Sequence, residues 1–186
     1  MTPTPQPGDY FVTRTAGPWY DRLAAWAIRW GTARRIDGRW HNAQYNHAGL
    51  YTGDGVIVEA VGRIRYNTLD AYPDAVWSTG RLPAHLAPDP EQRRLIVNKA
   101  HDLIGTPYSW LDLLAIGLAQ KRAGAHVNSD TWWARRINSD GHLLCSQAVD
   151  VEYAAGEIAL FDDGRLPGLV SPQDLGDLLL PVQAGA

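Results

Sequence analysis

Cysteine is almost absent from this chain, because Cys145 is the only one among 186 residues. A single thiol cannot form an intramolecular disulfide, and it leaves no second cysteine for a zinc site. Long hydrophobic runs are also missing, since no segment approaches the roughly 20 apolar residues that span a bilayer. The fold must therefore rest on a hydrophobic core, and 186 residues suffice for one domain with a sizeable core.

Acidic and basic residues are nearly balanced, with 20 of the former and 17 of the latter. The formal net charge is -3, without the basic excess that marks a nucleic-acid-binding surface. Residues 1–7 are proline-rich and uncharged, and they lack the basic and apolar regions of a secretory signal. We therefore expect a protein that is soluble and cytoplasmic as synthesised, with a flexible N-terminus over residues 1–7, no nucleic-acid partner and no transmembrane segment. No glycine-rich phosphate motif or metal-ligand spacing is present, so we expect no cofactor and no metal.

Strand patterns precede helix patterns along the chain. Strands are predicted over residues 8–15, 48–52, 56–61, 63–68 and 75–79, with a hairpin turn at Gly53-Asp54-Gly55. Helices are predicted over 18–30, 90–104, 110–119, 145–155 and from 172 onward, two of them opened by capping boxes at 89–92 and 171–174. Residues 31–46 are expected to form a loop. The strand-rich half followed by a helix-rich half indicates an α+β fold in one domain.

Cys145 stands where an apolar-periodic segment begins, after Leu143-Leu144 and before Ala148-Val149. This position predicts the first turn of a helix, where the helix dipole and free N–H groups favour a thiolate. A backbone N–H at that end can also hold an oxyanion. The alternative is a buried, inert cysteine, because free cysteine is among the most buried residue types.

His47 opens a strand that continues Ala48-Gly49-Leu50-Tyr51. His47, Gly49 and Tyr51 therefore share one face, and Gly49 leaves room beside the histidine for another backbone or for a substrate. A histidine on a strand and a cysteine at a helix start form a candidate base and nucleophile. The alternative is a hydrogen-bonded structural histidine.

Glu59 interrupts an otherwise apolar strand, where a carboxylate is costly without a partner. If Tyr51 pairs with Ile57, then Gly49 faces Glu59, and His47 is a diagonal neighbour within side-chain reach. Glu59 would then hold one imidazole nitrogen and leave the other for the thiol. A register shifted by one residue would turn Glu59 to the opposite face. A carboxylate on an edge strand facing water is the alternative.

Other candidates lie in polar or aromatic segments. Tyr108, in the turn Gly105-Thr106-Pro107-Tyr108, can donate to an oxyanion or to substrate, or it can pack under the loop. Candidates for the walls or lid of a substrate cleft are Trp40, Trp132, Trp133 and the arginines at 34, 35 and 39. Ordinary packing and solvated charge are the alternatives for each of them.

Two sets of motifs resemble the NlpC/P60 cysteine peptidases. Gly105-Thr106-Pro107-Tyr108-Ser109-Trp110 followed by Cys145-Ser146-Gln147-Ala148-Val149 resembles the paired segments around that family's nucleophile. His47-Ala48-Gly49-Leu50-Tyr51-Thr52-Gly53 followed by Val58-Glu59-Ala60 resembles its histidine strand and the next strand, with the third catalytic residue at the place of Glu59. Here the cysteine segment follows the histidine strand. That order, with the opening Gly8-Asp9-Tyr10-Phe11, resembles the circularly permuted YiiX-like and lecithin retinol acyltransferase-like branch.

The resemblance implies a single permuted, papain-like domain over residues 8–186, with an antiparallel sheet or small barrel packed against helices. It implies a thiol hydrolase that cleaves an amide bond in a cell-wall peptide through Cys145, His47 and Glu59, with Tyr108 as a further catalytic residue. Such an enzyme would act on the wall when released from a bacterium or carried by a phage. The chain departs from the family at Leu111-Asp112, at Ser146-Gln147 and in the length of 121–141, which bears on the substrate.

Two other functions stay open. The same triad could serve a thioester acyltransferase or a lipid hydrolase, which a deep apolar tunnel beside Cys145 would favour. A non-enzymatic binding or virion structural protein could keep the fold, and a Cys145 far from His47 would favour that reading.

Overall fold

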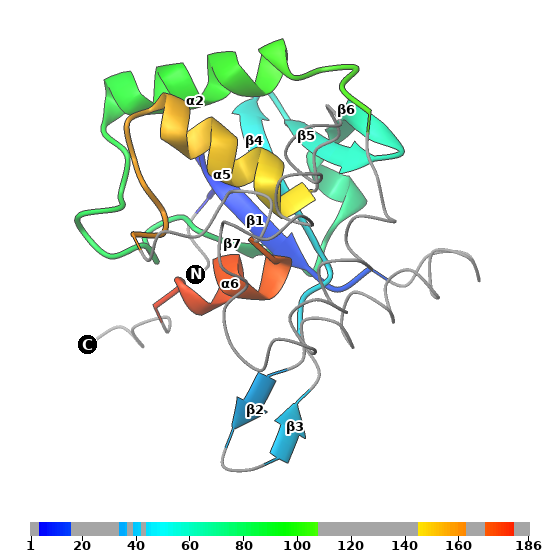
Figure 1. Ribbon diagram of the computed structural model, residues 1–186. Helices are drawn as coiled ribbons and strands as arrows, with labels where there is room; N and C mark the ends of the chain where they lie inside the picture. The colour runs from blue at the N-terminus through cyan, green and yellow to red at the C-terminus, as the bar shows by residue number, and fades with distance from the viewer. Residues whose placement is uncertain are drawn as a thin grey trace, which may run out of the picture.

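An open five-stranded antiparallel sheet organises the protein, with its strands in the order β6-β5-β4-β1-β7 (Figure 1). The computed structural model describes residues 4–15, 34–36, 39–41, 44–107, 145–162 and 170–180. The strands are β1 (Tyr10–Thr13), β4 (His47–Gly53), β5 (Val56–Val61), β6 (Arg63–Thr68) and β7 (Val76–Trp77). The predicted α+β class is confirmed, and the sheet is open rather than closed into a barrel.

A tight turn between β4 and β5 sets the register of the sheet. Gly53, Asp54 and Gly55 have φ values of 110°, 52° and 75°. Glycine reaches this left-handed region without steric cost, and aspartate tolerates it better than most residues. Tyr51 pairs with Ile57, and Gly49 pairs with Glu59. The structure therefore has the register that the contact between His47 and Glu59 requires, which the sequence alone leaves open.

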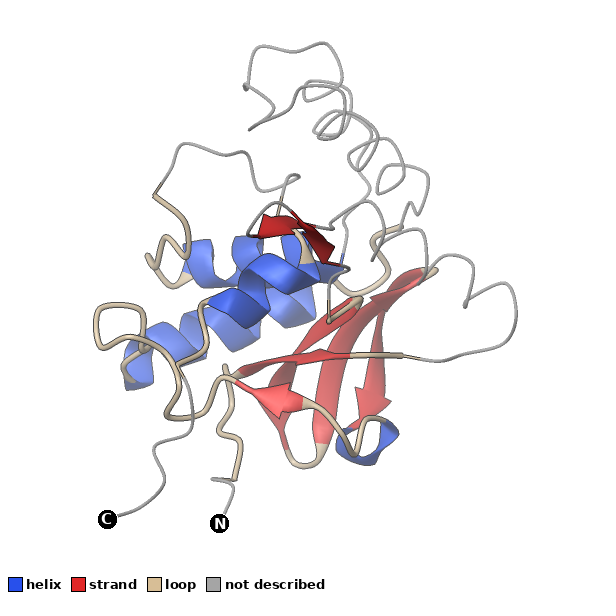
Figure 2. Ribbon diagram, turned by 90° about the horizontal axis from the view of Figure 1, so that it is seen from below, coloured by secondary structure: helices blue, strands red, loops and turns tan. Residues whose placement is uncertain are grey.

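Helices α2 (Pro90–Asp102) and α5 (Cys145–Ala155) cover one face of the sheet (Figures 1 and 2). The predicted capping box starts α2, since the Asp89 carboxylate accepts from the Gln92 N–H at 2.8 Å and the Gln92 side chain accepts from the Asp89 N–H at 3.0 Å. A second predicted capping box, at Ser171 and Asp174, starts α6 (Pro172–Asp177). A 3-10 turn, η1 (Leu69–Ala71), follows β6.

The hydrophobic core lies between the sheet and these helices. Its buried members include Tyr10, Val12, Ala48, Leu50 and Val58 from the strands and Ile96, Ala100, Cys145 and Val149 from the helices. Phe11, Gly49 and Glu59 alternate with the strand residues of this core, so they lie on the opposite face of the sheet. His47 is on that opposite face too, at the first position of β4.

Residues 31–46, which the sequence analysis assigns to a loop, contain two short strands instead. β2 (Arg34–Ile36) and β3 (Arg39–His41) form a two-stranded antiparallel ribbon outside the main sheet (Figure 1). The helices predicted over 18–30 and 110–119 lie outside the described residues. Within the residues that are described, no helix is long and apolar enough to cross a bilayer.

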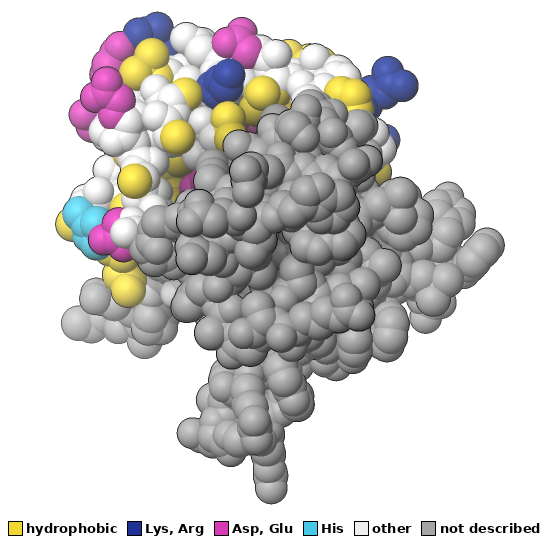
Figure 3. Space-filling model, in the orientation of Figure 1, with side chains coloured by type: hydrophobic (Ala, Val, Ile, Leu, Met, Phe, Trp, Pro, Cys, Tyr) yellow, Lys and Arg dark blue, Asp and Glu magenta, His cyan; other side chains and the backbone are white. Residues whose placement is uncertain are grey.

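The segment before β1 is tied to α2 and to its own strand. The Gln6 N–H donates to Asp9 Oδ2 at 2.8 Å, and Arg93 Nη1 donates to the Pro7 carbonyl at 2.9 Å and to Asp9 Oδ1 at 2.7 Å. These bonds hold Gln6 and Pro7, which belong to the stretch expected to be flexible. Acidic and basic side chains are mixed on the visible surface over α2 (Figure 3). Glu91 and Arg94 form an exposed ion pair on this helix.

Candidate active site

Cys145 is the first described residue of α5, because residues 108–144 lie outside the described ranges. It is 1% exposed and belongs to the hydrophobic core. The Ser146 hydroxyl donates to the Val170 carbonyl at 2.6 Å, and the Tyr153 hydroxyl donates to the Gly8 carbonyl at 3.0 Å. Both ends of α5 are therefore fixed to other parts of the fold, and the position of the thiol is fixed with them.

His47, the first residue of β4, pairs with Thr13 of β1 and is buried. Its Nε2 lies 2.9 Å from Oε2 of Glu59. Cys145 is near enough to the ring to be one of the groups that raise the pKa of His47. Because Nε2 faces Glu59, Nδ1 is the nitrogen left for the thiol. The structure thus brings the three predicted residues close together.

Glu59 is 2% exposed, and both of its carboxylate oxygens have donors. Oε1 accepts from Arg65 Nε at 3.1 Å, from Arg65 Nη2 at 3.0 Å and from Asn67 Nδ2 at 2.9 Å. Oε2 accepts from the Tyr72 hydroxyl at 2.5 Å in addition to its contact with His47. This burial rules out the alternative of an edge-strand carboxylate that faces water.

The charge of the pair follows from these contacts. Burial acts to raise the pKa of Glu59, but hydrogen bonds from His47, Tyr72 and Asn67 and the charge of His47 outweigh it and lower the pKa to about 2. Burial acts to lower the pKa of His47, but its interactions with Cys145 and Glu59 outweigh it and raise the pKa to about 9. At neutral pH, Glu59 is therefore an anion and His47 an imidazolium.

Aromatic rings enclose the imidazole. The ring centroid of His47 lies 5.2 Å from that of Tyr72 and 6.0 Å from that of Phe11, and the Phe11 and Tyr72 centroids are 5.3 Å apart. A Cβ atom at Gly49 would lie 2.7 Å from Phe11 Cε1 and 2.7 Å from the Val58 carbonyl oxygen. The room beside Gly49 is therefore filled by the Phe11 ring and a neighbouring backbone, and it leaves no space there for a substrate.

Sequence reasoning missed Arg65, Asn67 and Tyr72. Arg65 pairs directly with Glu59 across β5 and β6, and Asn67 is two residues further on the same face. Alternation along β6, combined with the register, is the signal that could have found both. Tyr72 follows η1 and lies outside any strand, so no periodic pattern marks it.

The other predicted site residues are not part of this arrangement. Tyr108, Trp132 and Trp133 lie outside the described residues. Trp40 belongs to β3 in the two-stranded ribbon, not to the sheet that carries His47 and Glu59. Nowhere in the described ranges do three or more His, Cys, Asp or Glu residues gather as candidate metal ligands.

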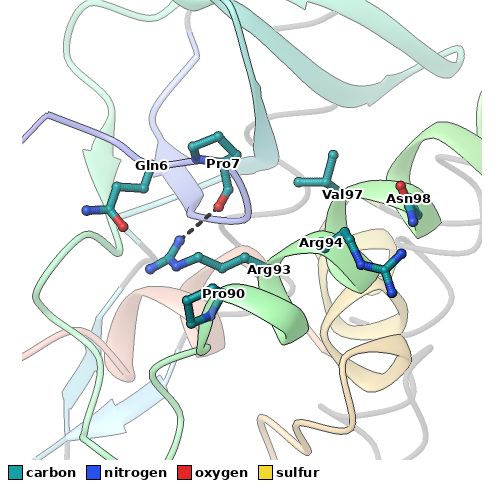
Figure 4. Close-up of a pocket in the computed structure, with 7 residues that line it drawn as sticks. All are labelled: Gln6, Pro7, Pro90, Arg93, Arg94, Val97 and Asn98. Carbon is teal, nitrogen blue, oxygen red and sulfur yellow. Dashed lines mark hydrogen bonds between the residues drawn. The ribbon is translucent and has the colours of Figure 1, made fainter.

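An open hollow lies beside the start of α2 (Figure 4), where Arg93 reaches the Pro7 carbonyl. Its lining residues are Gln6, Pro7, Pro90, Arg93, Arg94, Val97 and Asn98. None of them contributes to the arrangement around His47, so this hollow is a separate surface feature.

Compared with known proteins, this chain matches no protein-family model, no curated protein and no solved structure. The chemistry of the site therefore rests on its own geometry.

Proposed function

We propose that this chain is a thiol hydrolase that cleaves an amide bond in peptidoglycan peptides through Cys145, His47 and Glu59. One observation carries the proposal: the imidazole lies near the only thiol of the chain, and its Nε2 contacts a buried, ionised carboxylate. An inert core cysteine needs neither partner, and burying two charged groups is costly. Activation of a nucleophile by a base, which a third group orients, accounts for the arrangement.

In the proposed reaction, the Cys145 thiolate attacks the carbonyl carbon of the amide, and the carbonyl oxygen becomes an oxyanion. The backbone N–H of Cys145 in α5 is proposed to stabilise that oxyanion, with Tyr108 as a second donor. His47 gives its proton to the leaving nitrogen as the C–N bond breaks, which leaves a thioester on Cys145. Neutral His47 then takes a proton from water, the water attacks the thioester, and the thiolate and the imidazolium are restored.

The substrate class rests on the resemblance to the NlpC/P60 peptidases. The order of β4 and β5 before α5 supports a permuted, papain-like domain over residues 8–186. In the proposed domain, Trp40, Trp132 and Trp133 contribute to the substrate cleft. No membrane-spanning helix is found in the described residues, which is compatible with an enzyme that meets the wall after release from a cell or from a phage particle.

The test is mass spectrometry of purified peptidoglycan fragments, and separately of acyl lipids, after incubation with wild type or with Cys145→Ala. The proposal expects new peptide ends from peptidoglycan with wild type and none with Cys145→Ala. Products from acyl lipids alone would assign an acyltransferase or lipid hydrolase instead. An absence of any product that depends on Cys145 would favour a binding or structural protein.

A further inference from the structure

We infer that Tyr72 is a positioning residue of this site: its hydroxyl fixes the oxygen of Glu59 that faces His47, and its ring fixes the plane of the imidazole. The inference rests on the proposed function, because it concerns the orientation of the proposed base. Tyr72 would not touch substrate, and it would act only through Glu59 and His47.

The first observation is that Tyr72 and His47 share one carboxylate oxygen. The Tyr72 hydroxyl donates to Oε2 at 2.5 Å, and His47 Nε2 lies 2.9 Å from the same atom. Arg65 and Asn67 bond only to Oε1. They can hold the carboxylate in place, but Tyr72 is the described donor, other than His47, that fixes the direction in which Oε2 points.

The second observation is that the Tyr72 ring contacts the imidazole directly. The two rings are inclined at 48°, with centroids 5.2 Å apart, and Phe11 packs against both. These contacts restrict rotation of the His47 ring about its Cβ–Cγ bond. The restriction favours the orientation with one nitrogen towards Glu59 and the other towards Cys145.

The third observation concerns the protonation of the Tyr72 hydroxyl. Burial raises the pKa of Tyr72, and its hydrogen bond to Glu59 raises it further, as does the negative charge of Glu59. The hydroxyl therefore keeps its proton throughout the neutral range and remains a donor to Oε2. Because the carboxylate accepts this bond as an anion, the bond is charge-assisted and stronger than one between neutral groups.

Tyr72→Phe is the test, because it removes the hydroxyl and keeps the ring. Tyr66→Phe is the matched control, since the Tyr66 hydroxyl bonds to His101 and not to Glu59, and Tyr66 is half exposed. The first readout is the hydrogen exchange rate of the His47 Nε2–H proton, followed by NMR on imidazole-labelled protein. Loss of the Tyr72 bond should accelerate this exchange on the order of tenfold, the equivalent of one hydrogen bond. Tyr66→Phe should leave the rate unchanged.

The second readout is the rate at which iodoacetamide alkylates Cys145, measured against pH. The chain has a single cysteine, so the label reports one site. A thiol activated by His47 should react faster than free cysteine at about pH 6 in the wild type. A purely structural role for Tyr72 would lower the thermal stability of the protein without accelerating the exchange of the Nε2–H proton.

The two readouts separate the two ideas. Unchanged exchange of the Nε2–H proton in Tyr72→Phe would overturn the positioning role, whatever the thiol does. A wild-type thiol no more reactive than free cysteine at about pH 6 would overturn the proposed hydrolase, while the exchange rates would still decide the role of Tyr72. Faster exchange in Tyr72→Phe, together with a wild-type thiol that is more reactive than free cysteine, would support both.

Discussion

Replacing Glu59 by glutamine should remove both the charge of the site and part of its stability. Both carboxylate oxygens of Glu59 face hydrogen-bond donors. Glutamine presents an NH₂ group in place of one oxygen. In one orientation that group faces Arg65 and Asn67, and in the other it faces His47 and Tyr72. Either way, donors are set against donors in a buried place, where an unmade hydrogen bond is costly.

The pKa of His47 gives the size of the effect. It rises from 6.5 to about 9, and at about 1.4 kcal/mol for each unit of pKa this favours the imidazolium by about 3 kcal/mol. Cys145 and Glu59 share that contribution. Since breaking a buried ion pair typically costs about 3–5 kcal/mol, we expect Glu59→Gln to lose about 3 kcal/mol of unfolding free energy.

The pH dependence has a definite sign. A raised histidine pKa gives stability that is fully present below 6.5 and is lost as the pH rises through 9. The lowered pKa of Glu59 gives stability that is present above 4.5 and is lost as the pH falls through 2. The difference in unfolding free energy between wild type and Glu59→Gln should therefore be largest between pH 4.5 and pH 6.5, and it should shrink towards pH 9.

Urea unfolding at about pH 5.5 and about pH 9 measures this difference, and NMR titration gives the midpoint of His47. Glu91→Gln is the control, because Glu91 is the exposed partner of Arg94 and exposed ion pairs contribute little. The His47 midpoint should fall by about one unit or more in Glu59→Gln and stay unchanged in Glu91→Gln. A midpoint that stays near 9 in Glu59→Gln would refute the assignment of Glu59 as the partner that charges His47.

Three further substitutions test other parts of the structure. Burial raises the pKa of Glu152 to about 8, and its Oε2 has no hydrogen-bond partner among the described residues. Stability is therefore lost as the pH rises from 4.5 towards 8. Glu152→Gln should be more stable than wild type at about pH 7, by up to about 3 kcal/mol, with a gap that closes near about pH 4. A difference in thermal stability between wild type and Glu152→Gln that does not change with pH would contradict the raised pKa of Glu152. Gly49→Ala should lose about 1–3 kcal/mol in urea unfolding, because its Cβ would meet the Phe11 ring, and wild-type stability would show that the ring moves aside freely. Asp89→Ala should lose about 1 kcal/mol through its capping bond, and an unchanged urea midpoint would show that the cap contributes nothing.

The sequence shows the turn and the two strands, but not the register that brings His47 and Glu59 together. The Gly53-Asp54-Gly55 turn marks the hairpin of β4 and β5, whereas the pairing of Tyr51 with Ile57, which puts both side chains on one face, is known only from the structure. The capping box at Asp89, by contrast, predicts the start of α2, because its hydrogen bonds are local. Short-range rules of this kind can be read directly from residue order.

Other features depend on partners that residue order does not reveal. Tyr72 reaches Glu59 from an irregular segment, and its position depends on how the chain turns after β6. The ribbon of β2 and β3 was predicted as a loop because Arg34-Arg35-Ile36 and Arg39-Trp40-His41 show no apolar alternation along a strand. The sequence alone does not show what fills the space beside Gly49, because the Phe11 ring that fills it belongs to a different strand.

The acid–base part of the site is local in the chain, whereas the thiol is remote. His47, Glu59, Arg65 and Tyr72 belong to three consecutive strands and the turn that follows them, and Cys145 comes from a separate helix. Hairpins of neighbouring strands form in about 1–10 μs, while contacts of long sequence separation carry a larger entropic cost and form later. The carboxylate and the imidazole can therefore meet before α5 docks. Activation of the thiol then requires the long-range docking of α5, and a chain in which α5 has not docked carries an unactivated cysteine.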